Sequence, residues 1–150
     1  MHTNPVVTLT GPEGGRTVKI ETDHTYHGAT ANIRAEYITA PGRHTYENPG
    51  WMNGEEIILL VPKEVEINGI AYRETGYDTE FEGTFNCDDP FLMRFWGKAL
   101  RTLYVNMRDT FFDCPERERA QWWGDATELM GECFYTLSPS THALMGKAIH

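Results

Sequence analysis

The stretch CDDPFLMRFWGKALRTLYVNM, residues 87–107, marks a change in the character of the chain. Asp89 has the position of an N-cap. Pro90 suits the first helical position, because proline lacks a backbone N–H group and the N–H groups of the first turn have no partner within the helix. Apolar residues then recur with a helical period: Phe91, Leu92, Phe95, Trp96, Ala99, Leu100, Leu103, Tyr104 and Met107. The stretch therefore predicts a helix with a wide apolar face.

The residues before this stretch have the period of β-strands. Short β-rich runs alternate with turn residues: PVVTLT (5–10), RTVKIET (16–22), ANIRAEYIT (31–39), EEIILLVP (55–62) and EVEINGIAYR (64–73). This alternation predicts an antiparallel β region in two packed layers, a β-sandwich over residues 1–87. The continuous apolar run Ile57–Val61 predicts a strand that is buried on both faces.

Two more helices are predicted after the quoted stretch. Ala126, Leu129, Met130, Cys133, Phe134 and Leu137 have the spacing of one buried helix face, and a third helix is expected from about residues 138–141 to His150. Such helices cannot cover one another on all sides, so they need either the β region or further helices that this chain does not contain, and we expect the latter. The sequence is interpreted as an α+β multidomain fragment.

The overall charge excludes some partners. Thirteen Lys and Arg face twenty-two Asp and Glu, a net charge of −9, so nucleic acid and anionic lipid surfaces are not expected to bind. We see no export signal and no apolar run of membrane-spanning length, which leaves the localisation open, with a cytoplasmic protein expected if the N-terminus is native. The oligomeric state stays open as well. Cys87, Cys114 and Cys133 are interpreted as reduced thiols, expected in the core.

The segment between the first two helices has an unusual composition. Residues 113–125, DCPERERAQWWGD, contain six charged side chains, two tryptophans and one proline. Surface ion pairs, tryptophans in the core, and Asp125 as an N-cap with Glu128 three residues later are the simple structural explanations. Their combination in one restricted loop favours a binding site. Carboxylates, arginines and indole rings together are typical of sugar binding and glycoside hydrolysis.

Residues 113–126, DCPERERAQWWGDA, resemble the signature DCPQRERLGWTGDA of bacterial α-L-rhamnosidases of glycoside hydrolase family 78. Ten of the fourteen positions are identical, and the segment 85–109 is similar to the entry into that family's first barrel helix. The resemblance implies an (α/α)6 barrel, of which residues 88–150 would form the start. It also implies hydrolysis of terminal α-L-rhamnosides with inversion of configuration.

The resemblance further implies a role for each matching residue. Glu118 aligns with the general acid of the family, and Asp113 and Asp125 align with acids that bind the sugar. Arg117 and Trp122 align with residues that we expect to contact the substrate. The general base of an inverting mechanism has no counterpart in this chain, so we expect the isolated chain to be inactive.

The expected partner is a rhamnose-containing glycoside or polysaccharide, without a cofactor. No metal site is expected, because His24, His27, His44 and His142 are isolated from any ligand pattern. The alternative function is a non-catalytic β-sandwich module that binds carbohydrate or another protein, with the helices as an appendage.

Overall fold

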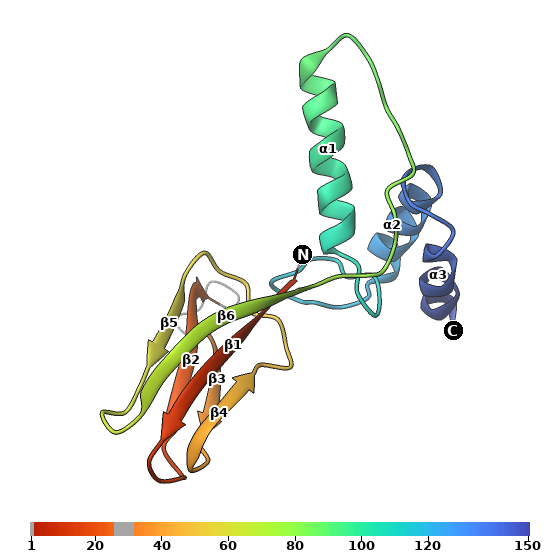
Figure 1. The fold of residues 1–150 in the computed structure, drawn as a ribbon. Helices are drawn as coiled ribbons and strands as arrows, with labels where there is room; N and C mark the ends of the chain where they lie inside the picture. The colour runs from red at the N-terminus through yellow and green to blue at the C-terminus, as the bar shows by residue number, and fades with distance from the viewer. Residues whose placement is uncertain (1, 26–31) are drawn as a thin grey trace. The chain divides into compact units, whose positions relative to one another are not determined.

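The computed structural model describes residues 2–25 and 32–150 (Figure 1). Strands precede helices along the chain, which confirms the predicted mixture of α and β structure. The elements are β1 (His2–Gly11), β2 (Thr17–Thr25), β3 (Asn32–Ile38), β4 (Gly42–Glu47), β5 (Ile57–Leu60), β6 (Glu66–Thr75), α1 (Pro90–Val105), α2 (Trp123–Thr136) and α3 (Thr141–Ile149). They form two compact units: residues His2–Thr75, called the β unit, and residues Gly76–His150, called the helical unit.

The β unit consists of two three-stranded antiparallel sheets. The strand order is β4-β1-β6 in one sheet and β3-β2-β5 in the other. Alternate residues of β1 and β2 enter one shared core, in which Val7, Leu9, Val18 and Ile20 are fully buried. Two sheets that share a core are what a β-sandwich requires, so the predicted two-layer arrangement is supported.

One strand was missed by the sequence analysis, and one prediction about the strands was wrong. Strand β4 was not predicted, because Pro41 and Gly42 have the composition of a turn; the turn exists, with Gly42 at φ +79°, but a strand pairing with β1 starts there. The apolar run Ile57–Val61 was expected to be buried on both faces. Instead β5 is the edge strand beside β2, and its side chains Ile57, Ile58 and Leu60 are each more than a third exposed.

Helix α1 begins where the sequence predicts. Asp89 has an extended backbone, its Oδ1 accepts a hydrogen bond from the Phe91 N–H at 2.7 Å, and Pro90 is the first helical residue. At the other end of α1, Leu103 joins the core of the helical unit. That core comprises Leu103, Met107, Phe111, Ala126, Leu129, Cys133, Leu137, Leu144, Met145 and Ala148.

The chain that enters the helical unit pairs with the end of α2. The N–H groups of Glu82 and Gly83 donate to the Thr136 carbonyl at 3.1 and 3.0 Å, and the Ser138 N–H donates to the Glu80 carbonyl at 2.9 Å. A Cβ atom on Gly83 would lie 2.1 Å from the Tyr135 carbonyl oxygen, so this approach requires glycine. Residues 76–87 thus pack with the helices, while the predicted domain ranges 1–87 and 88–150 stay predictions.

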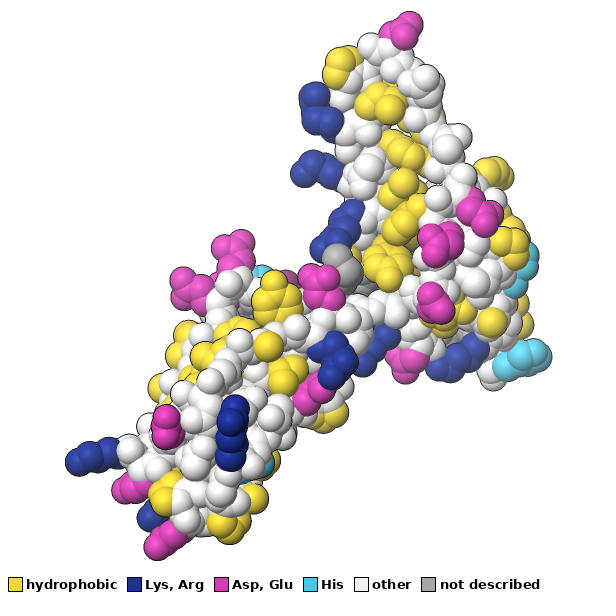
Figure 2. Space-filling model, viewed as in Figure 1, with side chains coloured by type: hydrophobic (Ala, Val, Ile, Leu, Met, Phe, Trp, Pro, Cys, Tyr) yellow, Lys and Arg dark blue, Asp and Glu magenta, His cyan; other side chains and the backbone are white. Residues whose placement is uncertain are grey.

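Much of the apolar face of α1 is exposed. Phe91 and Phe95 are 62% and 61% exposed, and Figure 2 shows hydrophobic side chains along this helix. The described residues therefore leave this face uncovered, and the (α/α)6 barrel that would cover it stays a prediction. None of the described helices combines the length and the hydrophobicity needed to cross a bilayer.

Candidate functional site

Residues 106–122, called the charged loop, connect α1 to α2, and their first part is anchored in the core. Phe111 and Phe112 are buried, and Phe111 forms an isolated β-bridge with Met107. The Phe112 N–H donates to the Asn106 carbonyl at 2.7 Å. The core therefore fixes the position of the backbone directly before the charged residues that follow Phe112.

Asp113 closes the following residues into a compact loop. Its backbone N–H donates to the Ala120 carbonyl at 3.0 Å, and its Oδ1 accepts a hydrogen bond from the Ala120 N–H at the same distance. We call this pair of hydrogen bonds the loop clasp. Arg119, directly before Ala120, has φ +51°, the only positive φ of a non-glycine residue in the described part of the chain. Such a conformation is costly for arginine and is retained where the surroundings fix it, as the loop clasp does here.

Glu118 lies within this loop and has several partners. Its Oε1 accepts a hydrogen bond from the Arg117 guanidinium, and its Oε2 accepts one from the Cys114 thiol at 3.3 Å. A carboxylate oxygen of Asp113, the Cys114 sulfur and a carboxylate oxygen of Glu118 all lie within 4.8 Å of one another. The loop thus gathers two carboxyl groups, a thiol and a guanidinium.

The environment of Glu118 shifts its proton affinity. The Arg117 guanidinium lowers the pKa of Glu118 to about 2, because it both hydrogen-bonds and attracts the ionised form. Partial burial acts in the opposite direction, and the contacts with Asp113 and Cys114 lower the pKa further. In this arrangement Glu118 is ionised at neutral pH. Donation of a proton would require Arg117 to move away first.

Three of the five predicted site residues lie together: Asp113, Arg117 and Glu118. Trp122 and Asp125 are exposed at the start of α2, with Trp122 58% exposed. Across residues 2–25 and 32–150, no hydrogen bond or ion pair joins either of them to the other three. The geometry therefore supports one cluster within the loop and two exposed side chains beyond it.

The prediction that Asp125 caps the second helix was wrong. Helix α2 already begins at Trp123, and the extended residue Trp122 is its N-cap, with its carbonyl accepting from the Ala126 N–H at 2.9 Å. Gly124 is thus inside the helix instead of in a turn before it. Asp125 lies in the first turn, where its charge interacts favourably with the helix dipole.

Two residues of the site were missed by the sequence reasoning. Cys114 was expected in the core but is only partly buried and donates to Glu118, whereas Cys133 is buried as expected. Gln121 ties the loop to α3, because its Nε2 donates to the Ala148 carbonyl at 3.1 Å. Neither the contact between Cys114 and Glu118 nor the long-range hydrogen bond of Gln121 was indicated by the sequence.

Asp113, Cys114 and Glu118 have donor atoms that could hold a metal ion. The Arg117 cation already neutralises Glu118, and an acidic cluster by itself is no evidence for an ion. The absence of a metal and of a cofactor therefore stays a prediction. His27, one of the histidines considered, lies outside the described residues.

Comparison with known protein families indicates the class of protein to which this site is similar. Residues 80–145 match the model of the bacterial α-L-rhamnosidase six-hairpin glycosidase domain. The match covers less than half of the chain, but it includes α1, the charged loop and α2. No curated protein and no solved structure matches the chain.

This part of the helical unit is thus similar to a glycosidase domain, which indicates a glycoside hydrolase-like function. Within that class the similarity is to the α-L-rhamnosidases. The resemblance of residues 113–126 to α-L-rhamnosidases is thus confirmed. The assignment to glycoside hydrolase family 78 stays a prediction.

Proposed function

We propose that the helical unit is part of the catalytic domain of an α-L-rhamnosidase of glycoside hydrolase family 78, which hydrolyses terminal α-L-rhamnosides with inversion. The observation that carries this proposal is the charged loop itself: within the stretch similar to the glycosidase domain, Glu118 lies beside Asp113 and Arg117. A rhamnose-containing glycoside or polysaccharide is the proposed substrate. The (α/α)6 barrel is the proposed fold of the complete domain.

Each side chain of the site has a defined role in this reaction. Glu118 protonates the glycosidic oxygen of the leaving group, which is the step of a general acid. Asp113 has one carboxylate oxygen in the loop clasp and one that can accept a hydrogen bond from a sugar hydroxyl. Arg117 donates to sugar oxygens, Asp125 accepts from sugar hydroxyls, and the exposed ring of Trp122 covers the apolar face of the sugar.

Arg117 must change its partner for Glu118 to act as an acid. Its contact with Glu118 keeps that carboxyl ionised, but the Arg117 side chain is 60% exposed, and exposed ion pairs are weak and easily replaced. A bound sugar offers oxygen atoms that the guanidinium can contact instead. Substrate binding would then free Glu118 to take up the proton that it donates.

Asp113 does not fit the role of the general base. An inverting mechanism places two carboxyl groups roughly 6.5 to 9.5 Å apart, which leaves room for the attacking water between the general base and the sugar, on the face opposite the general acid. Asp113 and Glu118 have oxygen atoms within 4.8 Å of each other and belong to the same short loop. The proposal therefore assigns the acid to Glu118 and leaves the base to a carboxylate outside this loop.

Titration of the ¹⁵N-labelled chain with L-rhamnose, followed by NMR, tests the proposed site. We expect saturable shifts of amide signals between residues 113 and 125, weakened by Trp122→Ala and by Asp125→Ala. Trp123→Ala is the matched control, because Trp123 is a neighbouring tryptophan of similar exposure without an assigned role. Absence of shifts in this segment, or an equal loss with Trp123→Ala, would contradict the proposal.

A further inference from the structure

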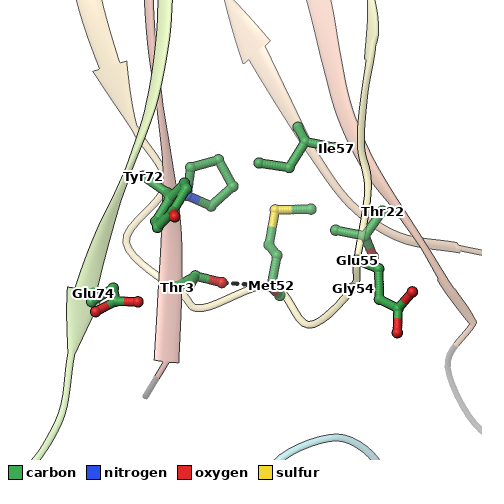
Figure 3. Close-up of a pocket in the computed structure, with 9 residues that line it drawn as sticks. Thr3, Thr22, Met52, Gly54, Glu55, Ile57, Tyr72 and Glu74 are labelled. Carbon is green, nitrogen blue, oxygen red and sulfur yellow. Dashed lines mark hydrogen bonds between the residues drawn. The ribbon is translucent and has the colours of Figure 1, made fainter.

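A pocket of about 270 Å³ lies between the two sheets of the β unit, at the end where β1 begins and β6 ends (Figure 3). Apolar side chains of Pro5, Met52 and Ile57 form part of its wall. Tyr72 and Glu74 of β6 line it from one side (Figure 3). The pocket belongs wholly to the β unit and shares no residue with the charged loop.

The strand register shows that the pocket is an unfilled continuation of the core. On β1 the inward-facing series runs from Leu9 and Val7 through Pro5 to Thr3, so it changes from apolar to polar towards this end. Pro5 pairs with Tyr72, and Thr3 pairs with Glu74, which places both β6 side chains on the same inward face. Polar residues at core-facing positions depart from the sheet pattern, and such departures are expected at functional sites.

Close backbone packing shapes another part of the wall. Gly54 approaches β2 so closely that a Cβ atom there would lie 2.6 Å from the Cβ of Thr22. Gly54 also has φ +154°, which disfavours other residues. The segment before β5 is thereby held against the β2 sheet, and Met52 is 4% exposed beside the pocket.

Of the polar groups around the pocket, the Thr3 hydroxyl donates to the Met52 carbonyl at 3.3 Å (Figure 3), whereas the Tyr72 hydroxyl and the carboxylates of Glu55 and Glu74 form no hydrogen bond within residues 2–25 and 32–150. Tyr72 is 62% exposed. Within the part of the chain that the structure describes, the carboxylates of Glu55 and Glu74 form no ion pair. In Figure 3 these two residues lie on opposite sides of the pocket. The site thus combines an aromatic ring, an apolar wall and two separated hydrogen-bond acceptors.

From this combination we infer that the pocket binds one neutral sugar ring, at a site separate from the proposed catalytic loop. The Tyr72 ring and the apolar wall suit the C–H face of a pyranose, and the carboxylates accept hydrogen bonds from hydroxyls on different edges of the ring. An anionic sugar would be repelled by these two carboxylates. The volume is slightly below the ~300 Å³ at which pockets for drug-sized ligands begin, which fits one ring.

NMR titration of the ¹⁵N-labelled chain with D-glucose, D-galactose and L-rhamnose tests this inference. We expect at least one of these sugars to shift the amide signals of Thr3, Met52 and Tyr72 in a saturable manner. D-Glucuronate and D-galacturonate are the matched anionic probes and should bind at least about fivefold more weakly than the corresponding neutral sugar, because of the carboxylates.

Variants in β6 test which side chains contact the bound sugar. Tyr72→Ala should weaken binding about tenfold, whereas Tyr72→Phe should keep it, because the ring is retained. Glu74→Gln should weaken binding about fivefold. Arg73→Ala is the control between them, since Arg73 pairs with Glu47 at 2.6 Å instead of lining the pocket.

Several results would overturn the inference: no saturable shift at these amides with any of the three sugars, equal binding of the uronates, or unchanged binding by Tyr72→Ala. Binding of Nα-acetyl-lysine amide in place of every sugar would also overturn it, since it would identify a site for a cationic side chain. Glu118→Gln should leave the pocket shifts unchanged. The outcome is therefore separate from that of the proposed rhamnosidase function, whose shifts are expected between residues 113 and 125.

Discussion

The carboxylate of Asp113 accepts a hydrogen bond from the backbone N–H of Ala120 at 3.0 Å, while the Ala120 carbonyl accepts one from the Asp113 N–H. A residue proposed to bind the sugar therefore also holds the loop that presents Glu118. Substitution of Asp113 changes both functions unless the replacement keeps the acceptor oxygen. Replacements of Asp113 with and without an acceptor oxygen can therefore separate loop stability from sugar binding.

We expect Asp113→Ala to lower the free energy of unfolding by about 1 to 2 kcal/mol, because it leaves the Ala120 N–H without its acceptor. Asp113→Asn retains an oxygen at the same position and should cost clearly less. Urea denaturation of both variants measures the difference. Equal stability of Asp113→Ala and the parent chain would show that the loop clasp does not stabilise the fold.

Arg117→Ala should raise the pKa of Glu118 from about 2 towards its ordinary value of 4.5, because the guanidinium is the largest cause of the shift. NMR titration of the Glu118 carboxyl carbon measures this change, with Arg101→Ala on α1 as the control. A lowered pKa in the folded state means that the contact stabilises the fold above about pH 4.5. This contribution is lost as the pH falls towards 2, so Arg117→Ala should flatten the acid part of the stability profile.

Glu118→Gln tests the assignment of the general acid. In a rhamnosidase that contains this loop in its complete domain, we expect turnover to fall by about 10²- to 10⁴-fold while rhamnose binding changes little. A substrate with a poor leaving group should show the largest loss, because it depends most on protonation. Near-normal turnover of such a substrate by the Gln variant would remove Glu118 from this role.

The 150-residue chain alone is expected not to hydrolyse p-nitrophenyl α-L-rhamnoside at an enzymatic rate. Asp113 lies too close to Glu118 to act as the base of an inverting site, and no other carboxylate of this chain is assigned to that task. A rhamnoside assay combined with size-exclusion chromatography tests this. Steady turnover by a monomer would place the base within these residues.

Asp89→Ala should destabilise the helical unit by about 1 kcal/mol, because it removes the side-chain cap of α1. Asp88→Ala is the matched control, since Asp88 is the preceding exposed aspartate and does not cap the helix. Thermal or urea unfolding of the two variants gives the comparison. The same loss in both would indicate a general charge effect instead of capping.

Local signals in the sequence were reliable at α1 but not at α2, where the expected cap at Asp125 was wrong. Asp89 and Pro90 marked the start of α1, and Cys133 was correctly expected in the core. Strand neighbours and local backbone conformation determined features that the sequence did not show. Exposure of Ile57 depends on which strand lies beside β5, and the start of α2 depends on the extended conformation of Trp122.

The candidate site follows the same rule. The spacing of Asp113, Glu118 and Asp125 was visible in the sequence, but the loop clasp was not, because its partner at Ala120 is a backbone group. The low pKa of Glu118 likewise depends on a side-chain conformation of Arg117 that no spacing determines.

The pairing of the segment before α1 with the end of α2 has a consequence for how the helical unit folds. Glu80 and Ser138 are 58 positions apart, so their contact closes a long loop that contains α1, the charged loop and α2. Such closure costs chain entropy before it is compensated by packing, and it cannot occur during synthesis until residue 138 is available. A break in the chain between residues 84 and 135 would separate the two paired segments, so neither piece is expected to reach the native arrangement by itself.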